Sequence, residues 1–515
     1  MIASNRGPMS FSYSSTGELR GQQGAGGLVS SLGPLIDGTG ATWVAAAMSD
    51  ADRDAARLGL TGGDGFRCQL VDIDPTVYAQ AYDVISNSTL WFLNHRLYDL
   101  ARAPVFDRRW RDAWDAYCAV NRRFAEVIAD HAPEGATVLV QDYHLNLVGA
   151  ALATRRPDLR AVHFTHTPFM DPVDLRVLPD FVAHELLGAM AAFAACGFHT
   201  REWASAFEAC CDVVGTTPSV FVSPLAPDVE NLTVVAQSAS CRSSGEQLDA
   251  AVRGRRVILR VDRIELSKNL LRGFWAFEEL LRSAPGMAGT VVFVALTYPS
   301  RETLTAYRAY RVEVEALAAR INREWGTDDW TPIILDTSDD YPRSVAALER
   351  YDVLLVNPIR DGLNLVALEG PLVNQRNGVL LLSREAGVWS ELRGSAIEVN
   401  PFDVFGTASA MGAALAMAPE RRRVHAAAVR ADAARRTPRD WLDDQLAAAQ
   451  LWEKGAEQSE DADGTVDADV GALDQGGGHF GAAHGDAHGD GDLVERGERT
   501  QIAEVISDET GGRHS

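Results

Sequence analysis

Two cations, Arg263 and Lys268, lie five residues apart in a segment whose neighbours indicate a ligand site. The segment DRIELSKN follows the apolar run Val257–Val261 and precedes a helical pattern, LLRGFWAFEELL. Arginine can make a planar, two-pronged contact with an anion and lysine adds a mobile point charge, a combination that suits a diphosphate. The N-terminus of the following helix would add partial positive charge. An alternative stays open, in which both are surface cations paired with Asp262 and Glu265.

A second segment, DGLNL, has the composition of an anion-binding turn at the start of a helix. It follows the apolar run Val353–Val356, and Gly362 permits a sharp turn. The backbone N–H groups of residues 363–366 would then point outward toward an anion. Asp361 and Glu369 flank this turn, where a carboxylate suits a sugar or ribose hydroxyl better than a phosphate. Glu369 could instead be an ordinary acid in the first turn of a helix.

The N-terminal region offers a third candidate segment for binding phosphate. Arg6 follows a short strand, and the glycine-rich stretch GAGGL, with Gly26 and Gly27, precedes an apolar helical pattern. A glycine loop that leads into a helix lets the backbone approach a phosphate closely. The segment is not the dinucleotide-binding pattern GxGxxG, since Val29 occupies the place of the third glycine. A simple turn explains it equally well.

Polar side chains also follow two other apolar runs. Asp142 follows TVLVQ and His166 follows AVHFT, so both are candidates for contacts with substrate hydroxyls. Tyr82 and Trp91 could form a wall against a sugar. A single histidine is more often structural, and aromatic residues at this spacing are more often part of a core.

The elements that must position these residues alternate in the pattern of a parallel sheet flanked by helices, which predicts an α/β fold. The expected strands are 137–141, 161–165, 257–261, 290–295, 332–335 and 353–356. The expected helices are 110–131, 272–282, 303–324, 343–350 and 408–417. The polar stretch 236–246 (AQSASCRSSGE) interrupts the alternation and is the expected linker.

The length of 515 residues predicts two domains, because single cores stop growing at roughly 250–300 residues. We expect one α/β domain over 1–240 and another over 250–435. Ligands of open α/β sheets bind beyond the carboxyl ends of the strands, so the cleft between the domains is the expected site.

The charge distribution argues against nucleic-acid or anionic-membrane binding. The net charge is −23, and residues 455–515 contribute −12 of it, with 15 Asp and Glu against 3 Arg. Neither part has the basic surface that those ligands need. The segment 454–515 is rich in Gly, His and acidic residues and too poor in large apolar residues to fold, so we expect a disordered tail.

The remaining composition indicates a soluble, cytoplasmic protein without cofactor or metal. There is no apolar run of about 18 residues and no signal peptide at the N-terminus. The six cysteines form no CxxC pair, which suits a reducing compartment. One alternative is a metal-dependent transferase of the GT-A type, because Asp72 and Asp74 form a DxD motif. That motif also recurs in the tail, and it leaves the cationic segments unexplained.

Eight segments in order resemble the trehalose-6-phosphate synthase family of retaining GT-B glycosyltransferases. They are SNRGP, GAGGL, SNSTLWFLNH, QDYHL, HTPF, VDRIELSKN, YPSR and RDGLNLVALE, and they cover residues 1 to about 450. The resemblance implies two Rossmann-like domains that face a central cleft. It also implies a final helix, 436–453, that crosses back onto the first domain.

The resemblance further implies which residues bind the two substrates. Arg6 and Arg301 would hold the phosphate of glucose 6-phosphate, with Tyr82, Trp91 and Asp142 around its sugar. The donor contacts would be Gly26, Gly27, Arg263, Lys268, Leu365, Val366 and Glu369 for the diphosphate and nucleoside, His166 and Asp361 for the glucose, and Asp340 for the base.

The implied reaction makes α,α-trehalose 6-phosphate from NDP-glucose, with UDP-glucose the usual donor, and glucose 6-phosphate. Arg263 and Lys268 would then act in catalysis by stabilising the departing diphosphate, beside Asp142 and His166. A separate phosphatase would be needed to release the phosphate from the product, and the enzyme could be a homo-oligomer.

This sequence also departs from the family pattern. Gln141 stands where the family has the first His of HDYH, and Leu368 replaces a common Lys. Only Met1–Ala3 precede the segment SNR, so either the first strand is short or the start of the sequence is misassigned. These departures indicate a divergent branch. Two alternatives remain: a sister synthase that uses a glycerol phosphate or cyclitol acceptor, and a non-catalytic regulatory homologue, although the latter would be expected to lose the phosphate-binding cations.

Overall fold

The first strand of the chain lies in the middle of a seven-stranded parallel sheet with the order β5-β4-β1-β6-β7-β8-β9. The computed structural model describes residues 1–23, 27–60 and 67–463. The strands are β1 (Ile2–Ser4), β4 (Thr42–Ala46), β5 (Arg67–Val71), β6 (Thr137–Gln141), β7 (Arg160–Thr165), β8 (Ala195–Phe198) and β9 (Val220–Val222). An antiparallel hairpin, β2 (Met9–Tyr13) and β3 (Leu19–Gln23), follows β1.

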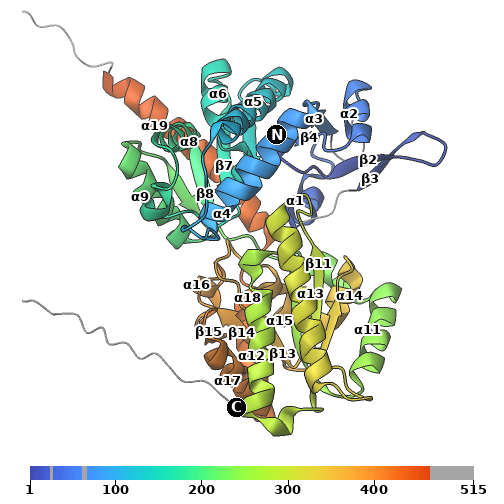
Figure 1. Ribbon diagram of the computed structural model, residues 1–515. Coiled ribbons are helices and arrows are strands. Elements are labelled where there is room, and N and C mark those ends of the chain that lie inside the picture. The colour runs from blue at the N-terminus through green and yellow to red at the C-terminus, as the bar shows by residue number, and fades with distance from the viewer. Residues whose placement is uncertain (24–26, 61–66, 464–515) are drawn as a thin grey trace, which may run out of the picture. The chain divides into compact units, whose positions relative to one another are not determined.

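Helices lie against this sheet, and all of its strands except the edge strand β9 are mostly buried, as parallel strands usually are (Figure 1). The α-helices of this half are α1 (Gly27–Ile36), α2 (Asp50–Arg57), α3 (Pro75–Ala79), α4 (Trp91–Asn94), α5 (Arg108–His131), α6 (Val148–Arg155), α7 (Pro172–Leu175), α8 (Asp180–Ala191) and α9 (Arg201–Val214). A π-helix over Gln80–Leu90 joins α3 to α4, and a short 3-10 helix spans Tyr143–Leu145.

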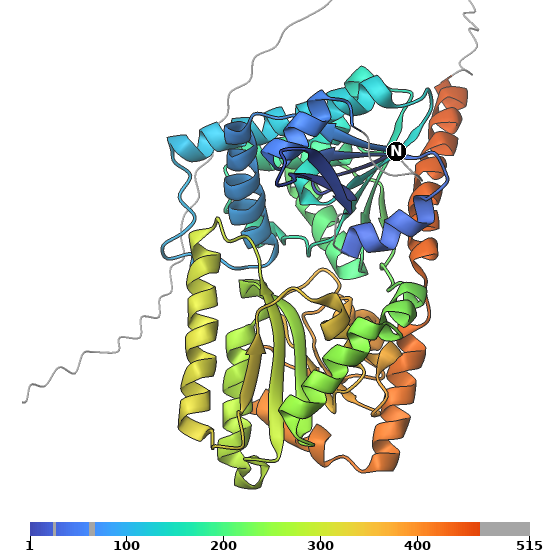
Figure 2. The same cartoon turned by 90° about the vertical axis from the view of Figure 1, so that its right-hand side faces the viewer.

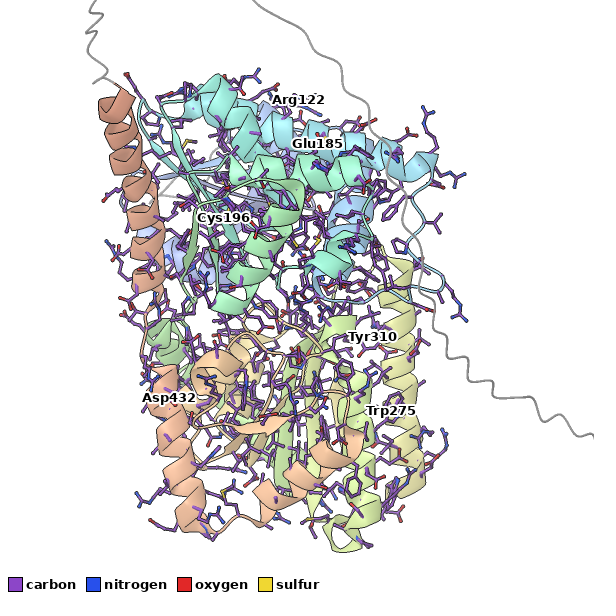
Figure 3. All side chains as sticks on the ribbon, turned by 90° about the vertical axis from the view of Figure 1, so that its left-hand side faces the viewer. Arg122, Glu185, Cys196, Trp275, Tyr310 and Asp432 are labelled. Carbon is purple, nitrogen blue, oxygen red and sulfur yellow. The ribbon has the colours of Figure 1, made fainter. Side chains whose placement is uncertain are left out.

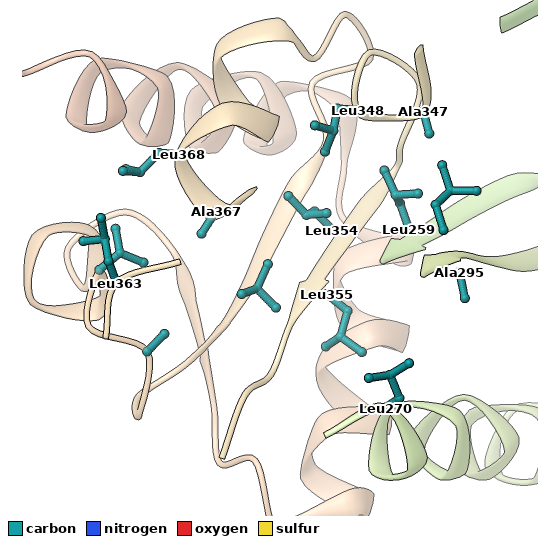
Figure 4. Close-up of a cluster of buried hydrophobic side chains, with 14 of the residues drawn as sticks. Leu259, Leu270, Ala295, Ala347, Leu348, Leu354, Leu355, Leu363, Ala367 and Leu368 are labelled. Carbon is teal, nitrogen blue, oxygen red and sulfur yellow. The ribbon is translucent and has the colours of Figure 1, made fainter. Parts of the chain in front are cut away.

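The second half is built on a six-stranded parallel sheet with the order β12-β11-β10-β13-β14-β15. Its strands are β10 (Arg256–Ile264), β11 (Val291–Pro299), β12 (Ile333–Asp336), β13 (Val353–Val356), β14 (Val379–Ser383) and β15 (Ile397–Val399). Its helices are α10 (Val229–Ala236), α11 (Ala239–Val252), α12 (Leu270–Ser283), α13 (Thr305–Trp325), α14 (Tyr341–Leu348), α15 (Val366–Val373), α16 (Trp389–Leu392), α17 (Val404–Ala416) and α18 (Pro419–Ala433). Leucines of β10, β13 and α15 pack in its core, beside Leu363 (Figure 4).

The chain passes between the halves twice. Residues 223–228 lead from β9 to α10, and residues 434–437 lead from α18 back to α19 (Pro438–Asp463), which runs beside the first sheet (Figure 2). Trp441 of α19 is fully buried against Phe164 of β7, with 5.1 Å between the ring centroids. Met1–Glu460 form one compact unit.

The predicted α/β fold is confirmed, and two expected strands, 137–141 and 353–356, have the observed bounds. The other expected strands and helices are found with their ends shifted by a few residues. The most relevant shift is in β10, which pairs with β11 from Arg256 to Ile264. The sequence had predicted Arg263 in the loop after the strand, but it lies inside the strand.

The prediction of a linker at 236–246 is wrong, because most of that stretch belongs to α11. Ser238 caps the helix by accepting a hydrogen bond from the backbone N–H of Cys241 (3.1 Å). Cys241 of α11 packs on Val345 of α14, together with Leu232 of α10. The helix is polar overall with a narrow apolar face, so its composition resembles that of a linker. Because α10 and α11 pack on the second half, we place the passage between the halves at 223–228.

The six cysteines are free thiols, and Cys196 of β8 is buried inside the first half (Figure 3). Within the described ranges, no helix is long and apolar enough to cross a membrane. The expected tail lies largely outside the described residues, which end at residue 463.

Candidate active site

The carboxyl ends of strands from both sheets face one cavity of about 1610 Å³. This is the position at which open parallel sheets bind ligands. The predicted site residues that line the cavity are Arg6, Tyr82, Trp91, Asp142, His166, Arg263, Lys268, Arg301, Asp361, Leu365, Val366 and Glu369. Residues far apart in the sequence therefore share one site.

Lys268 joins the two segments that the sequence indicated as anion sites. It lies in the 3-10 helix Leu266–Lys268 after β10, and its Nζ donates a hydrogen bond to Oδ2 of Asp361 (2.6 Å). A second carboxylate, that of Asp262, lies 3.7 Å from the same Nζ. Burial lowers the pKa of Lys268, but Asp361 and Asp262 outweigh burial and hold the pKa above its ordinary value. Lys268 is therefore a permanent cation in the cavity wall.

Arg263 is paired with a buried carboxylate. Its Nη1 lies 3.1 Å from Oε1 of Glu265, whose side chain is fully buried. Burial raises the pKa of Glu265, but Arg263 and Arg301 outweigh burial and lower the pKa to about 2. The side chain of Arg263 is 37% exposed and lines the cavity, so part of its guanidinium remains open to a ligand. The pairs that the alternative interpretation expected do form, but in the cavity wall and not on the outer surface.

Arg301 is held by groups from both halves. It follows β11 with a positive φ of 48°, and its side chain is only 8% exposed. Its guanidinium carbon lies 3.9 Å from the centroid of the Trp91 ring. Its hydrogen bonds run from Nε to Asn87 Oδ1 (2.7 Å), from Nη1 to Glu265 Oε1 (2.7 Å) and the Tyr307 hydroxyl (3.1 Å), and from Nη2 to the Tyr143 hydroxyl (3.1 Å). Arg301 thus links the two sheets across the cavity.

Arg6, the other predicted phosphate ligand, is exposed and lines the same cavity. Within the described part of the chain, no ion pair or side-chain hydrogen bond engages its guanidinium. The two predicted acceptor cations therefore differ. Arg301 is fixed by protein groups, and Arg6 is free to take an anionic ligand.

The π-helix over Gln80–Leu90 positions the aromatic wall. Its wide turns are supported by side chains, as Asn87 Nδ2 donates to the backbone O of Tyr82 (2.9 Å) and Thr89 Oγ1 donates to the backbone O of Val84 (2.8 Å). The ring of Tyr82 stacks on that of His144, with 5.7 Å between centroids. Trp91 begins α4 directly after the π-helix. Irregular helices of this kind often lie at functional sites.

In the turn before α15, the residue with a left-handed backbone conformation is Asn364 and not the predicted Gly362. Asn364 has a φ of 89°, and its side chain donates to Oδ2 of Asp361 (3.0 Å) and accepts from the backbone N–H of Ala367 (3.2 Å). Leu365 is the N-cap residue of α15, and Val366 is the first residue of that helix. Glu369, one turn on, lines the cavity, and burial raises the pKa of its carboxyl group to about 7.

Gly362 lies against the first half at the base of the cavity. A Cβ atom on Gly362 would lie 1.9 Å from the backbone O of His166, and the backbone O of Gly362 accepts a hydrogen bond from Trp203 Nε1 (3.0 Å). Only glycine permits this approach. The structure therefore explains this glycine by a close contact between the halves, and the positive φ of the turn belongs to Asn364.

Asp142 is strained and only partly exposed. Its φ is 72°, a backbone conformation that a residue with a side chain rarely adopts. Its Oδ1 accepts a hydrogen bond from the backbone N–H of His166 (3.2 Å). Burial raises the pKa of Asp142 to about 6, although the backbone N–H groups of Tyr143 and His166 oppose this rise.

The ring of His166 is bound by protein groups at both nitrogens. Nδ1 lies 3.2 Å from Nε2 of His199, and Nε2 lies 3.0 Å from Oε1 of Gln141. Burial, followed by the neighbouring His199 and His163, holds the pKa of His166 well below its ordinary value, so the ring is neutral.

Among the remaining predicted donor residues, Asp340 does not line the cavity. Gly26 lies outside the described residues, and Gly27 is the first residue of α1, whose Leu28 and Val29 line the cavity. Asp340 uses its side chain to cap α14 through the backbone N–H of Arg343 (3.0 Å). Its neighbours Asp339 and Tyr341 line the cavity in its place.

Sequence reasoning missed the groups that hold the cations. Asn87, Tyr143 and Tyr307 bind Arg301, yet they lie in three separate segments of the chain. Glu265 could have been found, because it lies beside Arg263 in the same motif. From the sequence alone, Glu265 is expected only as an ion-pair partner of the cations on the outer surface.

The DxD motif has structural roles. Asp72 pairs with Arg57, with 2.9 Å from Nε to Oδ2, and Asp74 caps α3 by accepting from the backbone N–H of Thr76 (2.9 Å). Neither residue lines the cavity. The geometry therefore gives no support to the GT-A alternative.

Comparison with known proteins decides the family. Residues 1–450 match glycosyltransferase family 20. The chain belongs to that family. One family 20 relative, trehalose-6-phosphate synthase of Mycolicibacterium vanbaalenii, is 33% identical over 456 residues, which cover 83% of this chain and 91% of the relative.

Two solved structures resemble this family 20 protein in fold. One is described as trehalose-6-phosphate from E. coli bound with UDP-2-fluoro glucose, with a TM-score of 0.75, 26% identity, and coverage of 87% of this chain and 98% of the other. The second is an α,α-trehalose-phosphate synthase (UDP-forming) from Burkholderia xenovorans in complex with glucose-6-phosphate, with a TM-score of 0.75, 26% identity, and coverage of 87% and 99%. The GT-B architecture expected from the sequence is thereby confirmed.

Proposed function

We propose that this family 20 glycosyltransferase transfers glucose from UDP-glucose to glucose 6-phosphate and gives UDP and α,α-trehalose 6-phosphate with retention of configuration. The observation that carries the proposal is that one cavity holds two cationic groups on different strands. Arg263 lies near the end of β10 and Lys268 in the 3-10 helix after it, whereas Arg6 and Arg301 follow β1 and β11. Such a cavity suits two anionic substrates at once.

We assign the donor to the second half. Arg263 and Lys268 would bind the diphosphate, and the backbone N–H groups at the start of α15 would add partial positive charge. Glu369 would accept hydrogen bonds from the ribose hydroxyls, because its carboxyl group is buried and has no cation beside it. Asp361, fixed by Lys268 and Asn364, would bind hydroxyls of the glucose.

We assign the acceptor mainly to the first half, with Arg301 reaching it from the second half. Arg6 and Arg301 would hold the phosphate, and the π-helix residue Tyr82 with Trp91 would pack against the sugar. Asp142 would orient an acceptor hydroxyl from the end of β6. The differing exposure of the two arginines supports this division, since Arg301 is preorganised and Arg6 can close on the phosphate.

The chemical step that fits these groups takes place on one face of the donor glucose. The bond from the anomeric carbon to the diphosphate oxygen breaks, and the acceptor oxygen forms its bond on the same face. The acceptor proton passes to the departing diphosphate oxygen. Arg263 and Lys268 would stabilise the charge on that oxygen, as preorganised charges in low-dielectric sites commonly do. The product keeps its phosphate, so a separate phosphatase would have to remove it.

The test is turnover of the purified protein with UDP-, ADP- and GDP-glucose, each with glucose 6-phosphate, and identification of the disaccharide by NMR. We expect trehalose 6-phosphate with an α,α linkage and a preference for UDP-glucose. Parallel assays with glycerol 3-phosphate and a cyclitol phosphate separate the sister synthases. A product only with one of these acceptors, or no nucleotide binding by calorimetry, would rule out the proposal.

A further inference from the structure

A continuous chain of hydrogen bonds links four buried or partly buried side chains, three of which line the cavity. They are His199, His166, Gln141 and Gln445, at the ends of β8, β7 and β6 and on α19. Gln141 and Gln445 are 304 residues apart, and both side chains are fully buried. The contact between two glutamines is 2.9 Å from Nε2 of Gln141 to Oε1 of Gln445.

One backbone group sets the direction of every bond in this chain. The backbone N–H of Leu225 donates to Nδ1 of His199 (3.3 Å), so Nδ1 of His199 is unprotonated. In a neutral imidazole the proton then lies on Nε2, which donates to Nδ1 of His166 (3.2 Å). The same rule places the proton of His166 on Nε2, which donates to Oε1 of Gln141 (3.0 Å). Burial lowers the pKa of His199 to about 3, which supports a neutral ring.

The amide end of the chain continues in the same direction. With its oxygen facing His166, the Gln141 side chain presents its NH₂ group to Gln445, which accepts. Gln445 in turn donates from Nε2 to the backbone O of Trp441, one turn earlier in α19 (3.4 Å). Each member thus has its donor and acceptor engaged, which is what a buried polar network needs to be stable.

The ends of the chain coincide with the two passages between the halves. Leu225 belongs to the first passage, residues 223–228, and Gln445 lies on α19 directly after the second. Between them, His166 faces the cavity, and its backbone O lies against Gly362 of the donor turn. The network therefore connects the two passages between the halves with the cavity, through His166.

We propose that Gln445 is a positioning residue of the donor site, which acts through Gln141 to fix the orientation of the His166 ring. Its effect on donor binding rests on the proposed function, but the hydrogen-bond chain does not. If Gln445 lost its oxygen, the Gln141 NH₂ group would be buried without an acceptor, and the cost of that loss would favour rotation of the amide away from His166.

The test compares three variants. Gln445→Met keeps the side-chain length but removes the acceptor, and Gln445→Glu restores it, since a carboxyl group keeps an oxygen that can accept whether it is neutral or ionised. Asp444→Ala is the matched control. Asp444 also anchors α19 to the first half, through Ser223 Oγ (2.7 Å), but it is not a member of the chain.

We expect Gln445→Met to raise the KM for UDP-glucose about ten-fold, with kcat and the KM for glucose 6-phosphate within about two-fold of the wild type. Gln445→Glu should return the donor KM to within two-fold, and Asp444→Ala should leave it unchanged. An unchanged donor KM in Gln445→Met, or an equal rise in Asp444→Ala, would overturn the proposal, the latter because it would show a loss of helix docking alone.

A spectroscopic measurement on the wild type keeps the inference testable if Gln445→Met does not fold. ¹⁵N NMR of labelled histidines distinguishes the two neutral tautomers, and we expect His166 and His199 to carry their proton on Nε2. An Nδ1-protonated ring at either position would contradict the chain. This measurement needs no substrate, so a wild type without synthase activity would reject the proposed function while leaving the network to be judged separately.

Discussion

At the scale of single residues, the cations of the cavity differ in how strongly other protein groups pair with them. Lys268 and Arg301 are held by buried carboxylates, Arg263 is partly held, and Arg6 is free within the described structure. These pairings keep buried cations charged and oriented before a ligand arrives. A chain with a net charge of −23 can therefore present a local site for anions.

Arg263→Ala should lower kcat by about 10²-fold or more, as loss of an electrostatic stabiliser commonly does. The fold should persist, because Arg301 still neutralises the buried Glu265. Steady-state kinetics measures the effect. Arg108→Ala removes an exposed arginine and serves as the control. Near-normal turnover of Arg263→Ala would exclude this residue from the catalytic step.

Glu369 predicts a dependence of donor binding on pH. Because burial raises its pKa to about 7, the carboxyl group is largely protonated at pH 6 and ionised at pH 8. Only the ionised form accepts hydrogen bonds from both ribose hydroxyls, so the KM for UDP-glucose should fall several-fold between pH 6 and pH 8. Glu369→Gln should bind the donor about ten-fold more weakly and flatten this dependence. A slope that persists in the variant would point to another group, such as Asp142.

The same shift has a stability consequence of opposite sign. A carboxyl group whose pKa is higher in the folded than in the unfolded state favours folding less as pH rises from about 4.5 to about 7. Without a donor, Glu369→Gln should therefore have a higher Tm than the wild type at pH 8 and nearly the same Tm at pH 4. Differential scanning fluorimetry at the two pH values tests this. An equal Tm at pH 8 would mean that the carboxylate finds a partner in solution.

At the scale of elements, the site depends on irregular pieces at the ends of regular ones. The π-helix, the 3-10 helix after β10 and the turn before α15 each carry ligand candidates. Regular strands bring these pieces together, and the irregular pieces aim the side chains. At Gly362 the turn before α15 lies so close to the first half that no side chain fits between them.

Gly362→Ala should unfold or distort the donor turn, because the added Cβ would lie 1.9 Å from the backbone O of His166. We expect a loss of stability of about 3 kcal/mol or more and a large loss of activity. Gly188→Ala is the control, since α8 leaves open space there and alanine favours a helix. Urea unfolding and kinetics test both. A Gly362→Ala variant as stable and active as the control would disprove the close contact.

Regular elements and the residues at strand ends could be predicted from the sequence because both depend on local patterns. The apolar runs that define β6 and β13 are local, and the polar residues that follow them fall at the sheet edge by geometry alone. What could not be predicted was pairing over long distances. The partner of Gln141 lies on α19, and the partners of Arg301 lie on both halves. α11 was missed because its apolar face is too narrow to stand out from a polar composition.

At the scale of the whole described unit, a few buried polar links cross between the two sheets. Arg301 is one. Arg360 is another, as its Nη2 donates to the backbone O of Phe169 (2.9 Å) and to Oδ2 of Asp171 (2.9 Å). The side chain of Arg360 is only 4% exposed and lies over the ring of Trp203.

Arg360→Met should lower the free energy of unfolding by about 2 kcal/mol, because the buried backbone O of Phe169 loses its donor, whereas Asp171 is 36% exposed and keeps Arg96 as a partner. Arg102→Ala breaks an exposed pair with Asp99 and should change stability by less than about 1 kcal/mol. Urea unfolding monitored by tryptophan fluorescence compares them. Equal effects in the two variants would show that Arg360 contributes no more than an ordinary surface charge.

The position of α19 also has a consequence for the order in which the molecule is made. The first sheet is complete once residue 222 has left the ribosome, but Trp441 and Gln445, which cover Phe164 and Gln141, are synthesised more than two hundred residues later. Until α19 is synthesised, Phe164 and Gln141 lack the contacts that Trp441 and Gln445 make with them. The N-terminal half therefore cannot complete this part of its surface until its neighbour has also been synthesised.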